Sequence, residues 1–439
     1  MYVSLLGFCA PCIRTFLNSL TEIEFFNNLG MDQMYRNGLK PGDRIELKID
    51  GVAFGGDGVG RFREQVVFVP FTVDGDEAAI RVTEVKKRFI RGRLEQLLAP
   101  SPWRIEPRCR YYTRCGGCQY QHIRDAHQAK IKEQQVNDAF VRIGRITVPP
   151  VSPIVTAPPT FQYRCKADYH VRTSAKEPPL IGFMDVENRR LVDIDHCEIV
   201  DESINEACLA FRRDLATGRL KTPWNRQTIW SADAIGEKAE VVTDFRRPRF
   251  VMRTVKGQNL MAPYRGFFQA NDFLLPRLVD DIVETSDLSG RESVADVHCG
   301  SGLFSLFLAP RVQQLYGIEM DGEAIHCARL NHRQAGFTHA LFYRGDAGDV
   351  LQRVFVAGKK KIDVLILDPP RIGCDPALIS AVTVLKPMKL IYLSCNPATQ
   401  ARDIGLMIEQ GFALKSLRPF DMFPQTAHIE AVALLERPG

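Results

Sequence analysis

The C-terminal part of the chain alternates short apolar runs with amphipathic stretches, and this alternation is the strongest constraint on the fold. The apolar runs are typical of buried strands, and the stretches between them have helical periodicity. This repetition predicts a doubly wound, Rossmann-like α/β sheet. The expected strands are residues 293–297, 314–319, 341–344, 362–367, 390–394, 412–417 and 430–435, and the expected helices are 302–311, 323–335, 349–355, 377–385 and 398–409.

Residues 35–98 show a different pattern, in which short alternating segments are separated by glycine. Residues 43–49, 66–70 and 78–82 alternate apolar and polar side chains, and residues 54–60 are expected to form a flexible turn region. These segments predict a small OB-like β-barrel. A further expected strand, residues 86–93, carries the cations Lys86, Lys87, Arg88, Arg91 and Arg93. A barrel with a basic edge indicates RNA binding, and an ordinary solvated face is the alternative.

Length and composition bound the domain organisation. The chain has 439 residues, more than one hydrophobic core usually holds. We expect an extension (1–34) that is disordered or weakly helical, or else outside the native product, and then the barrel (35–98). A central α+β domain (99–265), with an antiparallel sheet and a helix over residues 201–213, and the α/β domain (266–439) follow. No apolar run approaches the roughly 20 residues of a membrane span, so no membrane association is expected.

The cysteines indicate a cellular location and a metal site. The chain contains 12 cysteines and no convincing export signal, which favours a reducing, cytoplasmic compartment. Its net charge of +5 permits a polyanionic partner. Cys109, Cys115 and Cys118 stand around a Gly-Gly turn, and Cys197 follows far downstream. Four such thiols can hold a structural zinc ion or a [4Fe-4S] cluster, and four unrelated buried cysteines are the alternative.

The loop after the first expected strand of the α/β domain predicts a nucleoside cofactor. It contains Gly300 and Gly302 at the start of a helix, where glycine lets backbone amides approach a ligand. Glu319 ends the next strand, where a carboxylate can accept hydrogen bonds from ribose hydroxyls. Asp346, after the third strand, either binds an adenine edge or caps the following helix. The loop lacks the G-x-G-x-x-G pattern, which disfavours NAD and favours S-adenosylmethionine.

Segments near the C-terminal end supply the groups needed for covalent attack on a pyrimidine. Uracil carbon 5 becomes nucleophilic enough to take a methyl group once a thiolate has added to carbon 6, and a base must then remove the carbon 5 proton. Cys395 is the candidate nucleophile, and Glu430, whose apolar neighbours should raise its pKa, is the candidate base. Asp368 can hold the ring N3–H or the cofactor. Arg371 is expected to meet a phosphate or a structural carboxylate.

These segments resemble the RNA (uracil-5-)-methyltransferase family. The resemblance covers about residue 39 to the end and rests on Asp368-Pro369-Pro370-Arg371, Ser394-Cys395-Asn396-Pro397, His428-Ile429-Glu430, Phe268-Gln269-Ala270-Asn271 and the four cysteines. The barrel resembles a TRAM domain in its start Gly42-Asp43, the run 55–60 and the basic segment 86–93. The combination is similar to the iron–sulfur, TRAM-bearing branch that modifies 23S ribosomal RNA.

The resemblance implies S-adenosylmethionine-dependent methylation of uridine carbon 5 in 23S rRNA through a covalent cysteine adduct, without an obligate protein partner. It implies Cys395 as nucleophile and Glu430 as base; Asp368 and Arg371 at the substrate; Gln269, His298, Gly300, Leu303, Glu319, Asp346 and Asp368 at the cofactor; and Cys109, Cys115, Cys118 and Cys197 on a [4Fe-4S] cluster. The alternatives are a structural zinc ion, a tRNA substrate, an enzyme that methylates exocyclic nitrogens of nucleic acid, and a non-catalytic RNA-binding protein.

Overall fold

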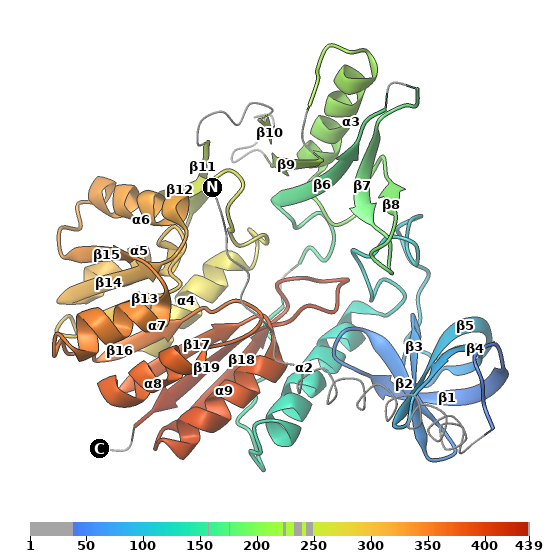
Figure 1. Ribbon diagram of the computed structural model, residues 1–439, viewed down its shortest axis with the longest axis horizontal. Helices are drawn as coiled ribbons and strands as arrows, with labels where there is room; N and C mark the ends of the chain where they lie inside the picture. The colour runs from blue at the N-terminus through green and yellow to red at the C-terminus, as the bar shows by residue number, and fades with distance from the viewer. Residues whose placement is uncertain are drawn as a thin grey trace, which may run out of the picture. The chain divides into compact units, whose positions relative to one another are not determined.

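The computed structural model describes residues 38–156, 158–174, 176–222, 225–231, 239–242 and 249–437 (Figure 1). The extension expected over residues 1–34 lies outside these described residues. The chain divides into two units, with the boundary between Arg104 and Ile105. No helix in the described ranges is both long and apolar enough to cross a membrane.

The first unit is a closed five-stranded barrel, as the alternating segments predict (Figure 1). Its strands are β1 (Arg44–Val52), β2 (Asp57–Phe62), β3 (Gln65–Pro70), β4 (Glu77–Val85) and β5 (Phe89–Ala99). They are arranged in the order β1-β2-β3-β5-β4, and only β3 and β5 pair in parallel. Alternate residues of β1, including Ile45, Leu47 and Ile49, pack in the apolar interior.

Two expectations for the barrel are wrong in part. The flexible turn expected over residues 54–60 ends at Gly56, because β2 begins at Asp57. Glycine is needed at position 60 because the neighbouring strand packs too closely for a side chain: a Cβ there would lie 2.3 Å from the Lys48 carbonyl oxygen. The strand expected over residues 86–93 begins later, because residues 86–88 form the turn before β5.

Replacing Gly60 with alanine should destabilise the barrel by about 1–3 kcal/mol, because the added methyl group overlaps the backbone of the paired strand β1. Urea unfolding followed by circular dichroism measures the change. Gly51→Ala is the matched control, since a Cβ at Gly51 meets nothing within 4 Å. Equal stability of the two variants would contradict the close approach at Gly60.

The second unit begins with a central part that carries the expected antiparallel sheet and helix. The strands are β6 (Lys166–Arg172), β7 (Leu180–Met184), β8 (Leu191–Asp193), β9 (Arg226–Trp230) and β10 (Glu240–Val241), in the order β10-β9-β6-β7-β8. The helix is α3 (Glu202–Ala216), which packs on this sheet through an apolar cluster. Asp201 caps α3 by accepting a hydrogen bond from the Ser203 amide at 2.9 Å.

The sequence prediction missed helix α2 (Asp125–Arg142) and the hairpin of β11 (Phe250–Val255) and β12 (Gln258–Pro263). Helix α2 buries polar side chains such as Gln128 and Lys132, so its apolar stripe is interrupted. A period search that counts apolar residues passes over such a helix.

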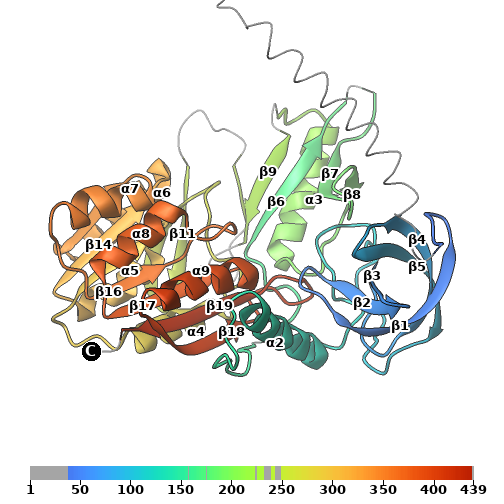
Figure 2. The ribbon, with the colours of Figure 1, turned by 60° about the horizontal axis from the view of Figure 1, so that its bottom comes forward.

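The α/β part is a seven-stranded sheet with helices on both faces, which confirms the doubly wound prediction (Figure 2). Its strands are β13 (Ser293–Val297), β14 (Gln314–Glu319), β15 (Ala340–Arg344), β16 (Val364–Leu367), β17 (Lys389–Ser394), β18 (Ala413–Phe420) and β19 (Glu430–Glu436), in the order β15-β14-β13-β16-β17-β19-β18. Its helices are α4 (Leu275–Ser286), α5 (Leu303–Leu308), α6 (Gly322–Gln334), α7 (Ala347–Val350), α8 (Pro376–Leu385) and α9 (Pro397–Glu409), with helical turns η1 (Ala309–Arg311) and η2 (Leu351–Val356).

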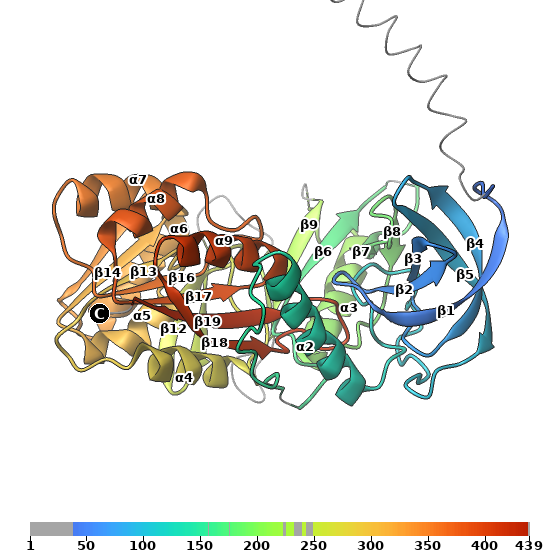
Figure 3. The same cartoon turned by 90° about the horizontal axis from the view of Figure 1, so that it is seen from below.

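Two apolar clusters lie on opposite faces of this sheet. One joins α4 and α5 to strand residues such as Val294, and the other joins α2, α8 and α9 to strand residues such as Ala295. Successive strand side chains point to opposite faces, so these two neighbours belong to different clusters. Figure 3 shows α4 on one side of the strands and α9 on the other.

The last strand, β19, runs antiparallel to both of its neighbours, β17 and β18. Its first residue therefore lies at the edge of the sheet where the parallel strands end. The register pairs Ser394 with Ala431 and Phe420 with Glu430. This reversal brings the start of β19 beside Cys395, the residue that follows β17.

Candidate active site

The ends of β16 and β17 and the start of β19 bring three of the predicted residues to one edge of the sheet. Asp368 follows β16, Cys395 follows β17, and Glu430 begins β19. Asn396 caps α9 with its Oδ1, and its Nδ2 donates to the carbonyl oxygen of Arg371 at 2.9 Å. This bond ties the loop after β16 to the turn that carries Cys395.

Cys395 and Glu430 lie close enough for their charges to interact. Burial, followed by the negative charge of Glu430, raises the pKa of the Cys395 thiol to about 11. Glu430 is 4% exposed, and burial, followed by the charge of Asp368, raises the pKa of its carboxyl well above the ordinary 4.5. Burial therefore disfavours the charged forms of both groups. A carboxyl with a raised pKa is a stronger base once it is ionised.

Arg371 supplies a positive charge to this edge. Its guanidinium donates to Nδ1 of His428 at 2.9 Å. It opposes the effect of burial on the pKa of both Cys395 and Glu430. Burial, followed by the charge of Arg371, lowers the pKa of His428 to about 4, so this histidine is a neutral acceptor at physiological pH. The sequence had suggested a phosphate or a carboxylate for Arg371, and the structure gives it a histidine and a thiol as neighbours.

Three carboxyl groups gather where β13, β14 and β16 end, because β13 pairs with both of the other strands. Burial, followed by the charges of Asp296 and Glu319, raises the pKa of Asp368 to about 8. Asp296 is fully buried, which raises its pKa to about 6, and it accepts hydrogen bonds from the amide and hydroxyl of Ser305. This group of acids favours a ligand that carries positive charge.

The loop after β13 has the backbone geometry of a ligand-binding turn. Gly302 precedes α5 with a φ of 79°, in the left-handed region. His298 has a φ of 62°, which few residues other than glycine adopt. The Gly300 amide donates to Glu319 Oε2 at 3.0 Å, so the carboxylate that ends β14 is held at the loop.

Several buried polar atoms around this loop have no hydrogen-bond partner within the part of the chain that the structure describes. They are Gln269 Oε1, Asp296 Oδ1, His298 Nδ1 and Ser301 Oγ. Such atoms are costly to leave unpaired, so they fit a polar ligand such as the expected nucleoside cofactor. Asn331 joins the β11–β12 hairpin, which precedes Gln269, to this loop by donating to the carbonyl oxygens of Met261 and Ser301.

The side chains of Leu303 and Asp346, two residues predicted to bind the cofactor, have structural contacts of their own. The side chain of Leu303 packs in the apolar cluster with α4, so only its backbone is available to a ligand. Asp346 caps α7 by accepting from the Asp349 amide at 3.1 Å, which is one of the two roles that the sequence left open. Burial lowers the pKa of His298, and the charges of Glu319 and Asp346 oppose that shift, so Asp346 still lies beside the loop.

Sequence reasoning missed two contributors to the site. His428 was visible in the segment before β19, but its contact with Arg371 joins residues 57 positions apart, and no local pattern reveals it. Asp296 had a usable signal. Asp296 lies inside an apolar strand, just before a loop that contains glycines. A carboxyl buried in this way is costly, so its presence indicates a functional or hydrogen-bonding role.

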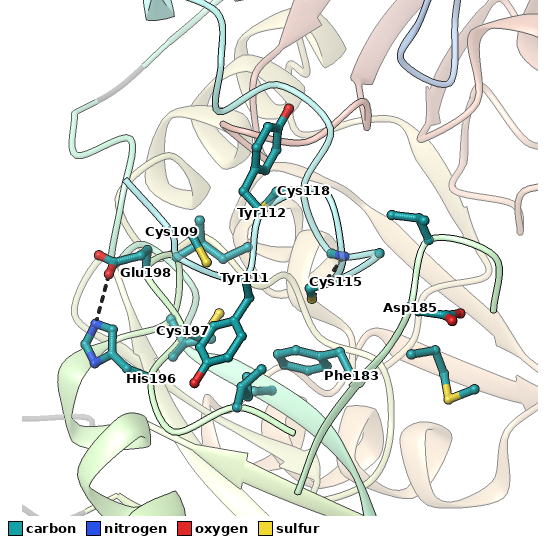
Figure 4. A pocket seen from close by; sticks show the side chains of 18 of the residues that line it. Cys109, Tyr111, Tyr112, Cys115, Cys118, Phe183, Asp185, His196, Cys197 and Glu198 are labelled. Carbon is teal, nitrogen blue, oxygen red and sulfur yellow. Dashed lines mark hydrogen bonds and ion pairs between the residues drawn. The ribbon is translucent and has the colours of Figure 1, made fainter. Parts of the chain in front are cut away.

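The four cysteines predicted to bind a metal line one pocket of about 500 Å³. Figure 4 shows Cys109, Cys115, Cys118 and Cys197 around this hollow, with Tyr111 and Phe183 beside them. Cys197 comes from the loop between β8 and α3, and the other three precede α2. Among the described residues, no group of three or more His, Cys, Asp or Glu side chains is placed to hold a metal ion. The structure therefore gathers the four thiols without displaying a metal site.

Comparison with known proteins adds independent information. A family model described as tRNA (Uracil-5-)-methyltransferase matches residues 249–438, and one described as TRAM domain matches residues 38–94. The chain is 32% identical to an uncharacterized RNA methyltransferase of Halalkalibacterium halodurans, over 90% of this chain and 97% of that protein. It is also 32% identical to an uncharacterized RNA methyltransferase of Thermosynechococcus vestitus, over 90% of this chain and 98% of that protein.

A solved structure shares the fold. It is the crystal structure of a Pyrococcus abyssi tRNA (uracil-54, C5)-methyltransferase in complex with S-adenosyl-L-homocysteine, with a TM-score of 0.66 and 24% identity over 89% of this chain and 100% of that chain. The barrel and the α/β part are thus each matched by a family model, and the bacterial relatives match the chain almost throughout. The chain belongs to the TRAM-containing RNA methyltransferase family, with an RNA uracil-5-methyltransferase domain at its C-terminal end.

Proposed function

We propose that this RNA methyltransferase methylates carbon 5 of a uridine in 23S ribosomal RNA, with S-adenosylmethionine as methyl donor and a covalent adduct between Cys395 and carbon 6. The observation that carries the proposal is the meeting of Cys395 and Glu430 at one sheet edge, because β17 and β19 are antiparallel and their neighbours Ser394 and Ala431 pair. A thiol and a carboxyl so placed supply the two groups that addition at carbon 6 and proton removal at carbon 5 require.

Residues of this chain account for the bond changes on the ring. The Cys395 thiolate forms a bond to carbon 6, and the displaced electron pair moves to carbon 5. Bound S-adenosylmethionine supplies the methyl group for carbon 5. Glu430, in its ionised form, then removes the carbon 5 proton. The electrons of that C–H bond restore the ring double bond as the bond between Cys395 and carbon 6 breaks, so the sulfur leaves as a thiolate.

Asp368 and Arg371 are assigned to the substrate. The Asp368 carboxyl, with a pKa of about 8, keeps a carbonyl oxygen in either protonation state, and this oxygen can accept a hydrogen bond from ring N3–H. Arg371 is exposed at the site and lowers the pKa of Cys395 against the effect of burial. Its guanidinium stabilises the thiolate and can also meet a phosphate of the RNA.

S-adenosylmethionine suits the residues around the loop after β13. The group of acids that includes Glu319 and Asp368 favours its sulfonium charge, and the unpaired buried atoms offer hydrogen bonds to its polar groups. The residues assigned to it are Gln269, His298, Gly300, Leu303 through its backbone, Glu319, Asp346 and Asp368. A solved fold neighbour is described in complex with S-adenosyl-L-homocysteine, which agrees with this assignment.

A [4Fe-4S] cluster on Cys109, Cys115, Cys118 and Cys197 is part of the proposal. The cysteine spacing and its resemblance to the iron–sulfur branch support this assignment, and the four side chains line one pocket of the protein. Iron and acid-labile sulfide in anaerobically purified protein are the expected result. Stoichiometric zinc without sulfide would instead assign these cysteines to a structural zinc site.

The covalent chemistry is tested by trapping with RNA that contains 5-fluorouridine. Fluorine at carbon 5 cannot leave as a proton, so the adduct should persist and migrate as a slow band on a denaturing gel. An enzyme that methylates exocyclic nitrogens forms no such adduct, and neither does a non-catalytic RNA-binding protein. Absence of the band with active protein would therefore reject the covalent route.

The choice of RNA has a second candidate. A TRAM barrel combined with four clustered cysteines resembles the branch that acts on 23S rRNA, whereas the fold neighbour from Pyrococcus abyssi is described as a tRNA methyltransferase. Mapping 5-methyluridine in both RNAs from a strain that lacks the gene separates the two. Loss of the methyl group from 23S rRNA is the expected result, and loss confined to tRNA would favour the second candidate.

Replacing Arg371 with methionine should raise the pKa of Cys395, because the guanidinium is the group that lowers it. Thiolate forms as the pH rises toward about 11, so alkylation of Cys395 by iodoacetamide should speed up with pH in the wild type, and the curve of the variant should shift to higher pH. Mass spectrometry of the Cys395 peptide measures the rate. Arg311→Met, at an exposed arginine of η1, is the control, and identical curves for all three proteins would contradict the role of Arg371.

A further inference from the structure

The loop between β18 and β19 contains His428 and leads directly into Glu430; we call residues 421–429 the base loop. Gln425, in the middle of the base loop, is completely buried. Its amide donates to Gln128 Oε1 at 3.0 Å, and its Oε1 accepts from Gln128 Nε2 at 3.0 Å. Its Nε2 donates to Asp125 Oδ1 at 2.9 Å. Helix α2 therefore holds both the backbone and the side chain of this residue.

The segment that follows Cys118 holds the base loop from another direction. The amides of Gln119 and Tyr120 donate to the carbonyl oxygen of Gln425 at 3.1 and 3.0 Å. Gln119 Oε1 accepts from the Ala427 amide at 3.1 Å. Each polar atom of Gln425 thus has a partner outside the base loop, which is the condition for a buried polar group to fix a single arrangement.

An ion pair fixes the beginning of the base loop. Lys132 of α2 is fully buried, and its Nζ lies 2.5 Å from Asp421 Oδ1 and 3.0 Å from the carbonyl oxygen of Phe423. Replacing such a pair by apolar residues is often neutral for stability, so a stabilising effect is a weak explanation for it. Its hydrogen bonds select one position of the loop relative to α2.

The backbone of Gln425 supports a positional role. Its φ is 67°, in the left-handed region that costs a residue with a side chain about 1–2 kcal/mol. Glycine adopts this conformation without that cost, so a turn that served only to reverse the chain would favour glycine. A buried glutamine persists there because its contacts to α2 outweigh the strain, and such strain is concentrated at functional sites.

We infer that Gln425 and Gln128 are positioning residues that hold Glu430 in reach of carbon 5 of the uracil ring. The inference rests on the proposed role of Glu430 as the base. Phe420 directly precedes the base loop, Glu430 directly follows it, and the two residues pair across β18 and β19. A base loop held in one position therefore also holds the backbone of Glu430, and with it the carboxyl, in one position. A misplacement of about 1 Å at a reacting group can cost about 100-fold in rate.

Two variants test this inference. Gln425→Gly removes the side chain and suits the left-handed φ, and Gln128→Ala removes the partner. In a single turnover with uridine RNA, adduct formation should stay within about twofold of wild type, while adduct decay should slow by about tenfold or more. The adduct should then accumulate on denaturing gels. Gln134→Ala is the matched control, because Gln134 is an exposed glutamine of the same helix, and both steps should match wild type.

The outcomes separate positioning from general stability. Loss of folded protein lowers both steps equally, so an equal loss in formation and decay, or an unchanged decay, overturns the inference. If Gln425→Gly does not fold, Gln119→Ala serves in its place, with the same measurement of adduct formation and decay. This variant removes the hydrogen bond from the Ala427 amide, and the Gln119 side chain is only half-buried. If Glu430→Gln accumulates adduct and the Gln425 and Gln128 variants do not, the positioning role fails alone. If Glu430→Gln accumulates none, the role of Glu430 as the base fails, and the inference falls with it.

Discussion

The Cys395→Ala variant should form no covalent adduct with RNA and should lose at least about 10⁴-fold in methylation rate, a loss of the order seen when other covalent enzymes lose their nucleophile. The reason is chemical: without addition at carbon 6, carbon 5 of uracil does not become nucleophilic enough to take the methyl group. Transfer of a radioactive methyl group to RNA measures the rate, and trapping with 5-fluorouridine RNA measures the adduct.

Cys327→Ala is the matched control for this experiment. Cys327 is a buried cysteine of α6, so its replacement removes a thiol without touching the edge of the sheet that carries Cys395. We expect this control to retain both the adduct and the activity. Methylation by the Cys395 variant at the rate of the control would reject the covalent route.

The Glu430→Gln variant should form the adduct and then fail to release it. Glutamine has the shape of the protonated carboxyl but cannot take the carbon 5 proton, so turnover should fall about 10²- to 10⁴-fold, the usual contribution of a general base. The measurement is the amount of protein that stays bound to uridine RNA on a denaturing gel. Glu436→Gln, at the opposite end of β19, is the control and should turn over normally.

The stability of the Glu430 variant provides an internal check on folding. Burial raises the pKa of the folded-state carboxyl above the ordinary 4.5, so the unfolded chain loses this proton at a lower pH than the folded protein does. Wild-type stability from this group is therefore full below the ordinary pKa and is lost as the pH rises. Glutamine does not titrate, so at mildly alkaline pH the variant should unfold at a temperature at least as high as wild type. A variant that is less stable than wild type at this pH would contradict the raised pKa of Glu430.

Much of the fold was accessible from the sequence because its signals are local. The alternation from residue 293 to residue 435 predicted all seven strands of the sheet, since each buried strand is an apolar run of its own. Half-buried alternation likewise predicts the barrel. Gly58 and Gly60 predict a turn in place of β2, because the sequence does not show how closely these glycines pack against neighbouring residues. The sequence pattern does not predict helix α2, because the buried face of this helix is partly polar.

The sequence by itself determined which groups are available: the thiol of Cys395, the carboxyl of Glu430 among apolar neighbours, and the glycines after β13. Only the tertiary structure decided which of them meet. Cys395 and Glu430 approach each other because β19 is antiparallel to β17, which places the start of one strand at the end of the other. The pairing of Arg371 with His428, and of Gln425 with Gln128, likewise depends on strand order and on where α2 packs. Strand direction and long-range packing are set by the whole sheet and its helices, so no local segment encodes them.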